Sequence, residues 1–383
     1  MTLRFDLVAE QLASVIAEYR EAARGLDAAG EAAAEAMRSW SADPEGGNQR
    51  IIAAMEGTAQ PYALAADEPP ADAFDAPPAE PSTVVAADGS SINPDRFAPV
   101  PCWVVNVGRV ALPYGVAGEP LLESRPTVGP TPVGSAASDG DEPEDALPLR
   151  WGINLLRDVM ELEAVADLAC SRVAFGPVVA LLDGTLLPWD LDAPQIPQSV
   201  RDHLRDRTAR ALDALRAAGP AVSLGAYISA SRAADVVNSL RALGVEPGAP
   251  LAADAVLFVR LLGSGQRSAL FRARSERMRR VEQQFPAHEV CFFYVRIDDD
   301  LARVELPAWA ATKERVGRLH RALLEQSRYC GGYPRALQEA HELAVISSRE
   351  REQFSRLLEA ESTRAGFVGI LAGKQRSKRR RVV

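Results

Sequence analysis

Residues 83–90 read TVVAADGS and residues 178–185 read VVALLDGT. Each segment is a short apolar run that ends in Asp-Gly followed by Ser or Thr, which predicts two buried strands of one sheet. An Asp-Gly pair alone indicates no more than a turn. Its presence at the ends of two separate strands favours a site, because open α/β sheets bind ligands at the carboxyl ends of their strands. We therefore expect an α/β fold whose functional site contains Asp88 and Asp183.

Residues 151–170 lie between these strands, show helical periodicity and carry two candidate carboxylates, Glu161 and Glu163. Two aspartates at adjacent strand ends repel each other unless a cation lies between them, and hard divalent metals are held in this way. We expect a third oxygen ligand from the helix. Glu161 is favoured because Val165 and Leu168 continue an apolar stripe on its face. Glu163 remains the alternative.

The C-terminal half offers a histidine and a group of arginines. In GGYPRALQEAH (residues 331–341), Pro334 suits the start of a helix and places His341 about two turns into it. There the imidazole could pack in the core, bind a metal or protonate a leaving group. Residues 260–277 combine arginines with small turn-forming residues, which suits phosphate contacts, although a solvated basic face has the same composition. The candidates for DNA contact are Arg260, Arg267, Arg272 and Arg274, together with Tyr333 before the helix of His341.

The net charge of −9 is unevenly distributed over the 383 residues. Residues 1–80 contribute −10 and residues 81–150 contribute −5, whereas residues 151–383 contribute +6. Lysine supplies only three of the 43 basic residues, so the body is rich in arginine, the better bidentate ligand for phosphate. The four cysteines form no CxxC pair, which argues against a zinc knuckle. Because no apolar run reaches the roughly 18 residues of a membrane span, we expect a cytoplasmic protein.

Composition divides the chain into four parts. We expect an N-terminal amphipathic helical arm over residues 1–63, an acidic Pro-rich linker over 64–82, the main domain over 83–365 and a basic disordered tail over 366–383. The acidic, Gly- and Pro-rich stretch 117–148 predicts a flexible insertion in the main domain. Within that domain we expect strands at 102–107 and 109–112, with Gly108 at the bend between them.

From about residue 83 to residue 360, the chain resembles the NurA family of DNA-repair nucleases. The resemblance rests on short words in a fixed order. They are ADGSS (87–91), LLDGTL (181–186), GQRS-x-x-F (265–271), FFYVR (292–296) with RVELP (303–307), and GGYPRALQEAH (331–341).

This resemblance implies a ribonuclease H-like core, in which helices flank a mixed sheet. It also implies hydrolysis of DNA with Mn²⁺, or with Mg²⁺, as 5′–3′ exonuclease and single-strand endonuclease. The implied partners are single-stranded DNA and duplex ends, a HerA-type hexameric ATPase that acts with the nuclease in resecting double-strand breaks, and a second copy of the chain. Asp88 and Asp183 match the family's metal ligands, and His341 matches its late active-site histidine. Glu161 or Glu163 is expected between them, with Tyr333 at the pocket wall.

Two other functions fit parts of the sequence. Actin-like and sugar-kinase ATP phosphotransferases also place Asp-Gly-Ser/Thr loops at two strand ends, but no convincing Gly-rich adenosine segment follows the second loop here. A non-catalytic partner of a DNA translocase would keep the aspartates as turn formers. An assay on labelled single-stranded DNA, with metal and without ATP, distinguishes the three functions.

Overall fold

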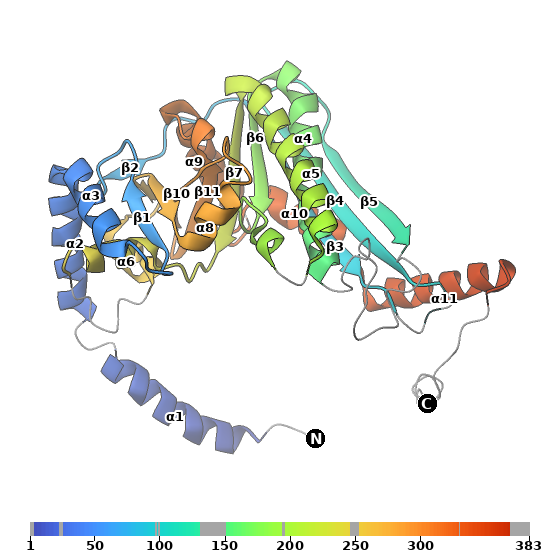
Figure 1. Cartoon of the computed structure of the whole chain (residues 1–383), viewed down its shortest axis with the longest axis horizontal. Coiled ribbons are helices and arrows are strands. Elements are labelled where there is room, and N and C mark those ends of the chain that lie inside the picture. Colours follow the sequence, from blue (N-terminus) through green and yellow to red (C-terminus); the bar gives the residue numbers. More distant parts are fainter. Residues whose placement is uncertain are drawn as a thin grey trace. The chain divides into compact units, whose positions relative to one another are not determined.

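The computed structural model describes residues 4–22, 26–95, 98, 100–130, 151–193, 196–245, 253–328 and 330–367. The chain divides into two compact units, each with its own strands and helices (Figure 1). The first unit comprises Met1–Pro77, Ile228–Glu282 and Glu289–Ala311, and the second comprises Pro78–Tyr227, Gln283–His288 and Thr312–Val383. Among the described residues, no helix combines the length and the apolar character that crossing a membrane requires.

The second unit is built on a mixed sheet in the strand order β7-β6-β3-β4-β5. Its strands are β3 (Ser82–Ile92), β4 (Cys102–Tyr114), β5 (Leu121–Pro130), β6 (Val178–Asp183) and β7 (Val222–Ser229). β3, β6 and β7 run parallel, while β4 and β5 extend the sheet in antiparallel pairing. The apolar run of β6 is buried from Val178 to Leu182, as expected for a parallel strand covered on both faces. The predicted α/β class, with a mixed sheet and flanking helices, is confirmed.

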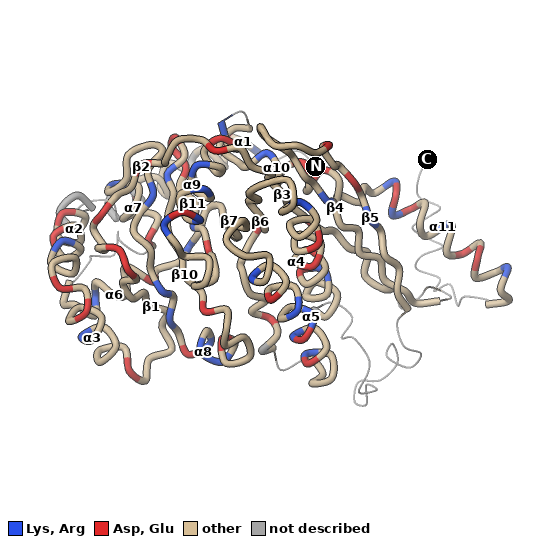
Figure 2. The backbone as a smooth tube through the Cα atoms, turned by 90° about the horizontal axis from the view of Figure 1, so that it is seen from above, with Lys and Arg blue, Asp and Glu red and all other residues tan. Residues whose placement is uncertain are grey.

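Helices cover both faces of this sheet. The helices of the second unit are α4 (Trp151–Arg172), α5 (Gln198–Ala217), α9 (Lys313–Ser327), α10 (Arg335–Ala344) and α11 (Ser348–Arg364), of which α4 and α10 make the main contacts with the sheet. A Cβ on Gly89 would meet α4, whereas a Cβ on Gly108 would lie 2.1 Å from the Ala340 carbonyl oxygen of α10. Gly108 pairs with Asp88, the neighbour of Gly89, so α4 and α10 pack on opposite faces. α11 is exposed over most of its length and carries interspersed acidic and basic residues (Figure 2).

The first unit contains an antiparallel sheet and a cluster of buried aromatic rings. Its strands are β1 (Tyr62–Ala65), β2 (Ala73–Asp75), β8 (Gln266–Ser268), β9 (Phe271–Arg274), β10 (Val290–Ile297) and β11 (Asp300–Pro307). They follow the order β1-β9-β10-β11, and β8 pairs with both β2 and β10. Phe271 stacks on Phe292, and Phe258 stacks on Tyr294. The helices are α1 (Phe5–Ala22), α2 (Leu26–Ala42), α3 (Pro44–Met55), α6 (Asp235–Ala242), α7 (Asp254–Leu261) and α8 (Glu276–Glu282).

Three predictions about the organisation are corrected by the structure. α2 packs against α6 and α7, and α3 packs against β1, so residues 26–55 belong to the first unit and only α1 remains as an arm. The proposed linker 64–82 contains β2 and the end of β1: Leu64 and Ala65 are buried, and Asp67 and Glu68 pair with arginines of the first unit. Residues 121–130 of the proposed insertion 117–148 form β5. Residues 131–148, and the predicted tail from residue 368 onward, lie outside the described residues.

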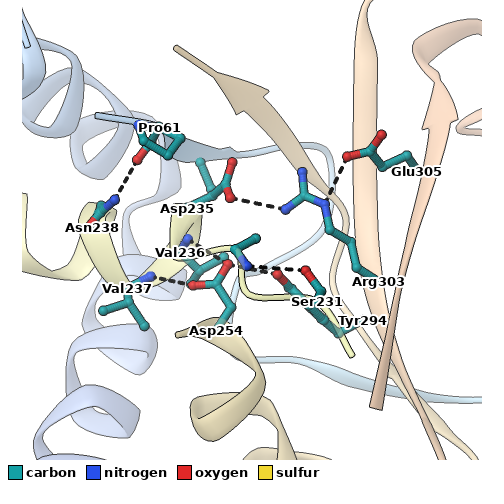
Figure 3. Close-up of polar contacts among 12 residues, drawn as sticks. Pro61, Ser231, Asp235, Val236, Val237, Asn238, Asp254, Tyr294, Arg303 and Glu305 are labelled. Carbon is teal, nitrogen blue, oxygen red and sulfur yellow. Dashed lines mark hydrogen bonds and ion pairs between the residues drawn. The ribbon is translucent and has the colours of Figure 1, made fainter. Parts of the chain in front are cut away.

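A network of buried charges lies between α6, α7, β10 and β11 of the first unit (Figure 3). The Asp254 carboxylate accepts hydrogen bonds from the backbone N–H groups of Val236 and Val237, at the start of α6, and from the Tyr294 hydroxyl. Arg303 pairs with Asp235 at 3.2 Å and with Glu305 at 3.0 Å. All the polar partners are internal, so we interpret this network as structural.

Asp254 makes the stability of the first unit dependent on pH. Burial, and then repulsion from Asp235, raises the pKa of Asp254 from 3.8 to about 7. Because the pKa is higher in the folded state, protonation of Asp254 stabilises that state. This contribution to the unfolding free energy is complete below pH 3.8 and is lost as the pH rises through 7. Relative to Asp254→Asn, the wild-type protein should therefore lose unfolding free energy between about pH 4 and pH 8. Urea unfolding curves of the two proteins that stay parallel over this range would contradict the assignment.

Candidate active site

A cavity of about 390 Å³ in the second unit has an acidic wall. Its charged lining residues are Asp88, Arg157, Asp158, Glu161 and Asp183. Another cavity of similar volume lies in the same unit, and its described lining, which includes Leu156, Met160 and Val200, is mainly apolar and contains no carboxylate. The acidic cavity is therefore the candidate for chemistry, since it alone of the two gathers titratable groups with shifted pKa values.

Parallel pairing of β3 with β6 brings Asp88 and Asp183 to the same level of the sheet. The register pairs Ala87 with Leu182, and each aspartate is the next residue of its strand. β6 ends there, because Gly184 adopts a left-handed φ of 93° and donates its N–H to the Tyr227 carbonyl oxygen at 2.9 Å. β3 continues to Ile92 in its pairing with β4. The sequence prediction that these two carboxylates meet at neighbouring strand positions agrees with this geometry.

Glu161 reaches the same cavity from α4, across Gly89. A Cβ on Gly89 would lie 2.6 Å from Glu161 Oε1, so the glycine leaves room for this carboxylate beside the strand. Glu161 is 7% exposed, and its Oε1 is buried without a hydrogen bond, although Arg157 Nε lies 3.2 Å away. A buried carboxylate oxygen without a hydrogen bond is unfavourable, and Oε1 could accept a metal ion in addition to its ion pair with Arg157.

Glu163, the alternative helix carboxylate, is absent from the residues that line the cavity. Its two oxygens accept hydrogen bonds from Arg207 Nε and Nη2 of α5, at 2.8 Å and 2.6 Å. This bidentate pair satisfies the carboxylate and links α4 to α5. Of the two candidates, the structure therefore brings Glu161 to the aspartates and places Glu163 in a helix–helix ion pair.

The carboxylates of the cavity are electrostatically strained. Burial raises the pKa of Glu161 well above its ordinary value, and repulsion from Asp158 adds to this effect. The pKa of Asp183 is raised by burial and by repulsion from Asp88, against the lowering effect of a hydrogen bond from Tyr333. Burial also raises the pKa of Asp158, against the attraction of Arg157. A cation in the cavity would relieve this repulsion, so the donor set fits a hard divalent metal.

The described residues contain no group of three or more His, Cys, Asp or Glu side chains already arranged to hold a metal ion. Two neighbouring groups instead hold the carboxylates: Arg157 lies beside Glu161, and His341 contacts Asp88. The donor chemistry suits a metal, while the present arrangement neutralises the carboxylates with the protein's own side chains.

Tyr333 and His341 come from the turn before α10 and from α10 itself. His341 Nδ1 lies 2.6 Å from Asp88 Oδ2, and the imidazole side chain is 64% exposed, so it is not the core residue that its helix face also allowed. The Tyr333 hydroxyl donates to Asp183, and its ring packs edge-on against Tyr227 at 5.5 Å. Burial raises the pKa of Tyr333, so its hydroxyl stays protonated and remains a donor. Both side chains can orient the strand-end carboxylates.

Sequence reasoning missed two charged residues of the cavity, Arg157 and Asp158. They precede Glu161 by four and three residues, spacings that place side chains on one face of a helix. That spacing was the only available signal, and it gains meaning only once Glu161 is known to face the cavity.

The four arginines predicted to bind DNA belong to the first unit. Arg267 is buried, donates to both oxygens of Glu68 at 2.7 Å and 2.8 Å, and lies over the Phe74 ring, so its guanidinium has a structural role. Arg274 pairs with Glu282 and Glu289. Arg260 and Arg272 keep more exposed side chains, at the end of α7 and on β9.

Known proteins support the fold independently of this site. The NurA domain family model matches residues 82–346, a range that contains Asp88, Glu161, Asp183 and His341. The crystal structure of the NurA nuclease from Sulfolobus solfataricus is similar to the chain with a TM-score of 0.54 at 14% sequence identity. The match covers 95% of this chain and 98% of the Sulfolobus chain, which shows a shared fold. No curated protein sequence matches the chain.

Proposed function

The chain belongs to the NurA family, and on that premise we propose that it is a metal-dependent nuclease that cleaves DNA in the cytoplasm. The observation that carries the proposal is the meeting of Asp88, Glu161 and Asp183, from β3, α4 and β6, on one acidic cavity. The order of elements in the second unit, three antiparallel strands followed by a helix and a parallel strand, supports a ribonuclease H-like core. In such cores, carboxylates at the strand ends serve metal-dependent phosphodiester hydrolysis.

The residues that would hold the metal are Asp88, Glu161 and Asp183. Their oxygen donors suit Mn²⁺, which we expect, and also Mg²⁺. A bound divalent ion would lower the pKa of an attacking water and would neutralise charge on the phosphate. Tyr333 keeps the Asp183 carboxylate oriented through its hydrogen bond. His341 holds Asp88 through Nδ1, and its exposed imidazole can deliver a proton to the departing oxygen.

The finer activity follows from the family. We propose 5′–3′ exonuclease and single-strand endonuclease activity in the resection of double-strand breaks, carried out as a homodimer with a HerA-type hexameric ATPase. For the partner contact we propose α1, because its apolar side chains Phe5, Leu12 and Ile16 are at least half exposed. Since α2 and α3 pack into the first unit, a deletion limited to residues 1–22 tests this contact without opening the core.

The activity test uses purified protein, 5′-labelled single-stranded DNA and no ATP. We expect cleavage in Mn²⁺ and intact substrate in EDTA, because the carboxylates alone cannot activate water or neutralise the phosphate. A denaturing gel resolves the products, and their length distribution separates exonucleolytic from endonucleolytic cutting. Intact DNA in Mn²⁺ at every protein concentration would contradict the proposal. ATP hydrolysis in a separate reaction with ATP and without DNA would then favour the phosphotransferase function.

A further inference from the structure

Arg157 is the single basic residue among the described residues that line the acidic cavity. It lies on α4, one turn before Glu161, and its side chain is 32% exposed. The other charged lining residues are the four carboxylates Asp88, Asp158, Glu161 and Asp183. A nucleic acid that enters this cavity brings further negative charge, so a permanent positive charge at the wall would attract its phosphates.

The contacts of Arg157 leave part of its guanidinium available. Nε and Nη2 donate to Asp158 Oδ1 at 3.2 Å and 2.8 Å. Nε also lies 3.2 Å from Glu161 Oε1 without forming a hydrogen bond to it. Nη1 makes no hydrogen bond within the described part of the chain. Asp158 therefore fixes one edge of the guanidinium, while donors on the other edge stay open, in the planar geometry that suits phosphate oxygens.

The backbone beneath Arg157 indicates that this placement is specific. A Cβ on Gly89 would lie 2.7 Å from Arg157 Cγ and 2.6 Å from Glu161 Oε1. The same glycine thus admits the arginine stem and the helix carboxylate over β3, directly beside Asp88. Because the stem packs against the strand, the guanidinium is held at the cavity wall.

We propose that Arg157 binds a phosphate oxygen of the DNA strand next to the bond that is cut, and that Asp158 orients its guanidinium. This inference rests on the proposed function, since it assumes that DNA enters the acidic cavity. It assigns a substrate-binding role to Arg157 and a positioning role to Asp158. The competing explanation is that Arg157 only neutralises Asp158 and Glu161, as an internal ion pair.

Salt dependence of DNA binding distinguishes the two roles. Each phosphate contact on a single strand contributes about 0.7 to the slope of log affinity against log salt concentration. We expect Arg157→Gln to lower this slope by about 0.7 and to weaken binding by about 10- to 100-fold at low salt. Fluorescence anisotropy with a labelled single-stranded oligonucleotide measures both quantities, in Ca²⁺ under conditions where a denaturing gel shows intact DNA. An ion-pair role alone predicts a changed unfolding temperature with an unchanged slope.

Arg172→Gln is the matched control, because it removes the same charge from the same helix. Arg172 donates to the Glu119 carbonyl oxygen and lies 15 residues further along α4, about 22 Å away. Its variant should keep the wild-type slope. Arg157→Lys should also keep the slope while binding about threefold or more weakly, since lysine retains the charge but not the planar donor edge.

Each outcome decides the proposal. A wild-type slope in Arg157→Gln, or wild-type affinity in Arg157→Lys, overturns the proposed role of Arg157. The nuclease function is then still judged separately by the Mn²⁺ cleavage assay. A wild-type protein that binds no DNA overturns both proposals.

Discussion

Asp183→Asn is expected to lower Mn²⁺-dependent DNA cleavage at least about 1,000-fold, because it removes a charged metal ligand from the cavity. The variant should fold normally. The pKa of Asp183 is raised by burial and by repulsion from Asp88, so removing its charge relieves strain, and the unfolding temperature should stay level or rise. Single-turnover cleavage of a labelled single strand, with thermal unfolding of the same sample, measures both effects.

Asp206→Asn is the control for this substitution. Asp206 lies on α5 with a side chain that is 63% exposed, and within the described part of the chain its ion pair is a long one, 3.4 Å from Arg205. It should retain wild-type cleavage. Cleavage by Asp183→Asn within a few-fold of wild type would show that Asp183 is not a metal ligand. The pairing of β3 with β6 would then no longer explain the chemistry.

Glu161→Gln should reduce cleavage at least about 100-fold, whereas Glu163→Gln should stay within about threefold of wild type. The two residues lie two positions apart on one helix, so they form a matched pair. Glu161 lines the cavity with a carboxylate oxygen that makes no hydrogen bond, while both oxygens of Glu163 bind Arg207. Single-turnover cleavage rates of the two variants in Mn²⁺ give the comparison.

The unfolding free energy should rank the same two variants in the opposite order to their cleavage rates. Glu161→Gln removes a buried charge whose pKa is raised well above its ordinary value, so it should not destabilise the fold. Glu163→Gln weakens a partly exposed ion pair between α4 and α5, which is worth up to about 1 kcal/mol. If Glu163→Gln were the inactive variant, the helix ligand would have to be reassigned.

The parts of the site that follow from local pattern could be predicted from the sequence. The apolar runs that end at Asp88 and Asp183 define buried strands, and parallel pairing of such strands aligns their ends. Pro334 marks the start of α10 and so sets the position of His341. These inferences use only short-range periodicity and turn chemistry, which the sequence displays directly.

The parts that depend on long-range packing could not be predicted. Gly108 suggests a bend between two strands, but β4 is continuous through it, and the glycine instead makes room for the backbone of α10. Arg267 looks like a phosphate ligand until Glu68, nearly 200 residues away, is found to bind it. Glu161 and Glu163 differ little in helical pattern, and they are separated by tertiary contacts: Glu161 lines the cavity, while Arg207 binds Glu163.

Binding of Mn²⁺ to the DNA-free protein, followed by electron paramagnetic resonance, tests whether the acidic cavity is a metal site. We expect the wild-type protein to bind Mn²⁺. We expect no binding by a variant that carries both Asp88→Asn and Asp183→Asn and that thermal unfolding shows to be folded. Equal Mn²⁺ binding by the two proteins would contradict the assignment of the acidic cavity as the metal site.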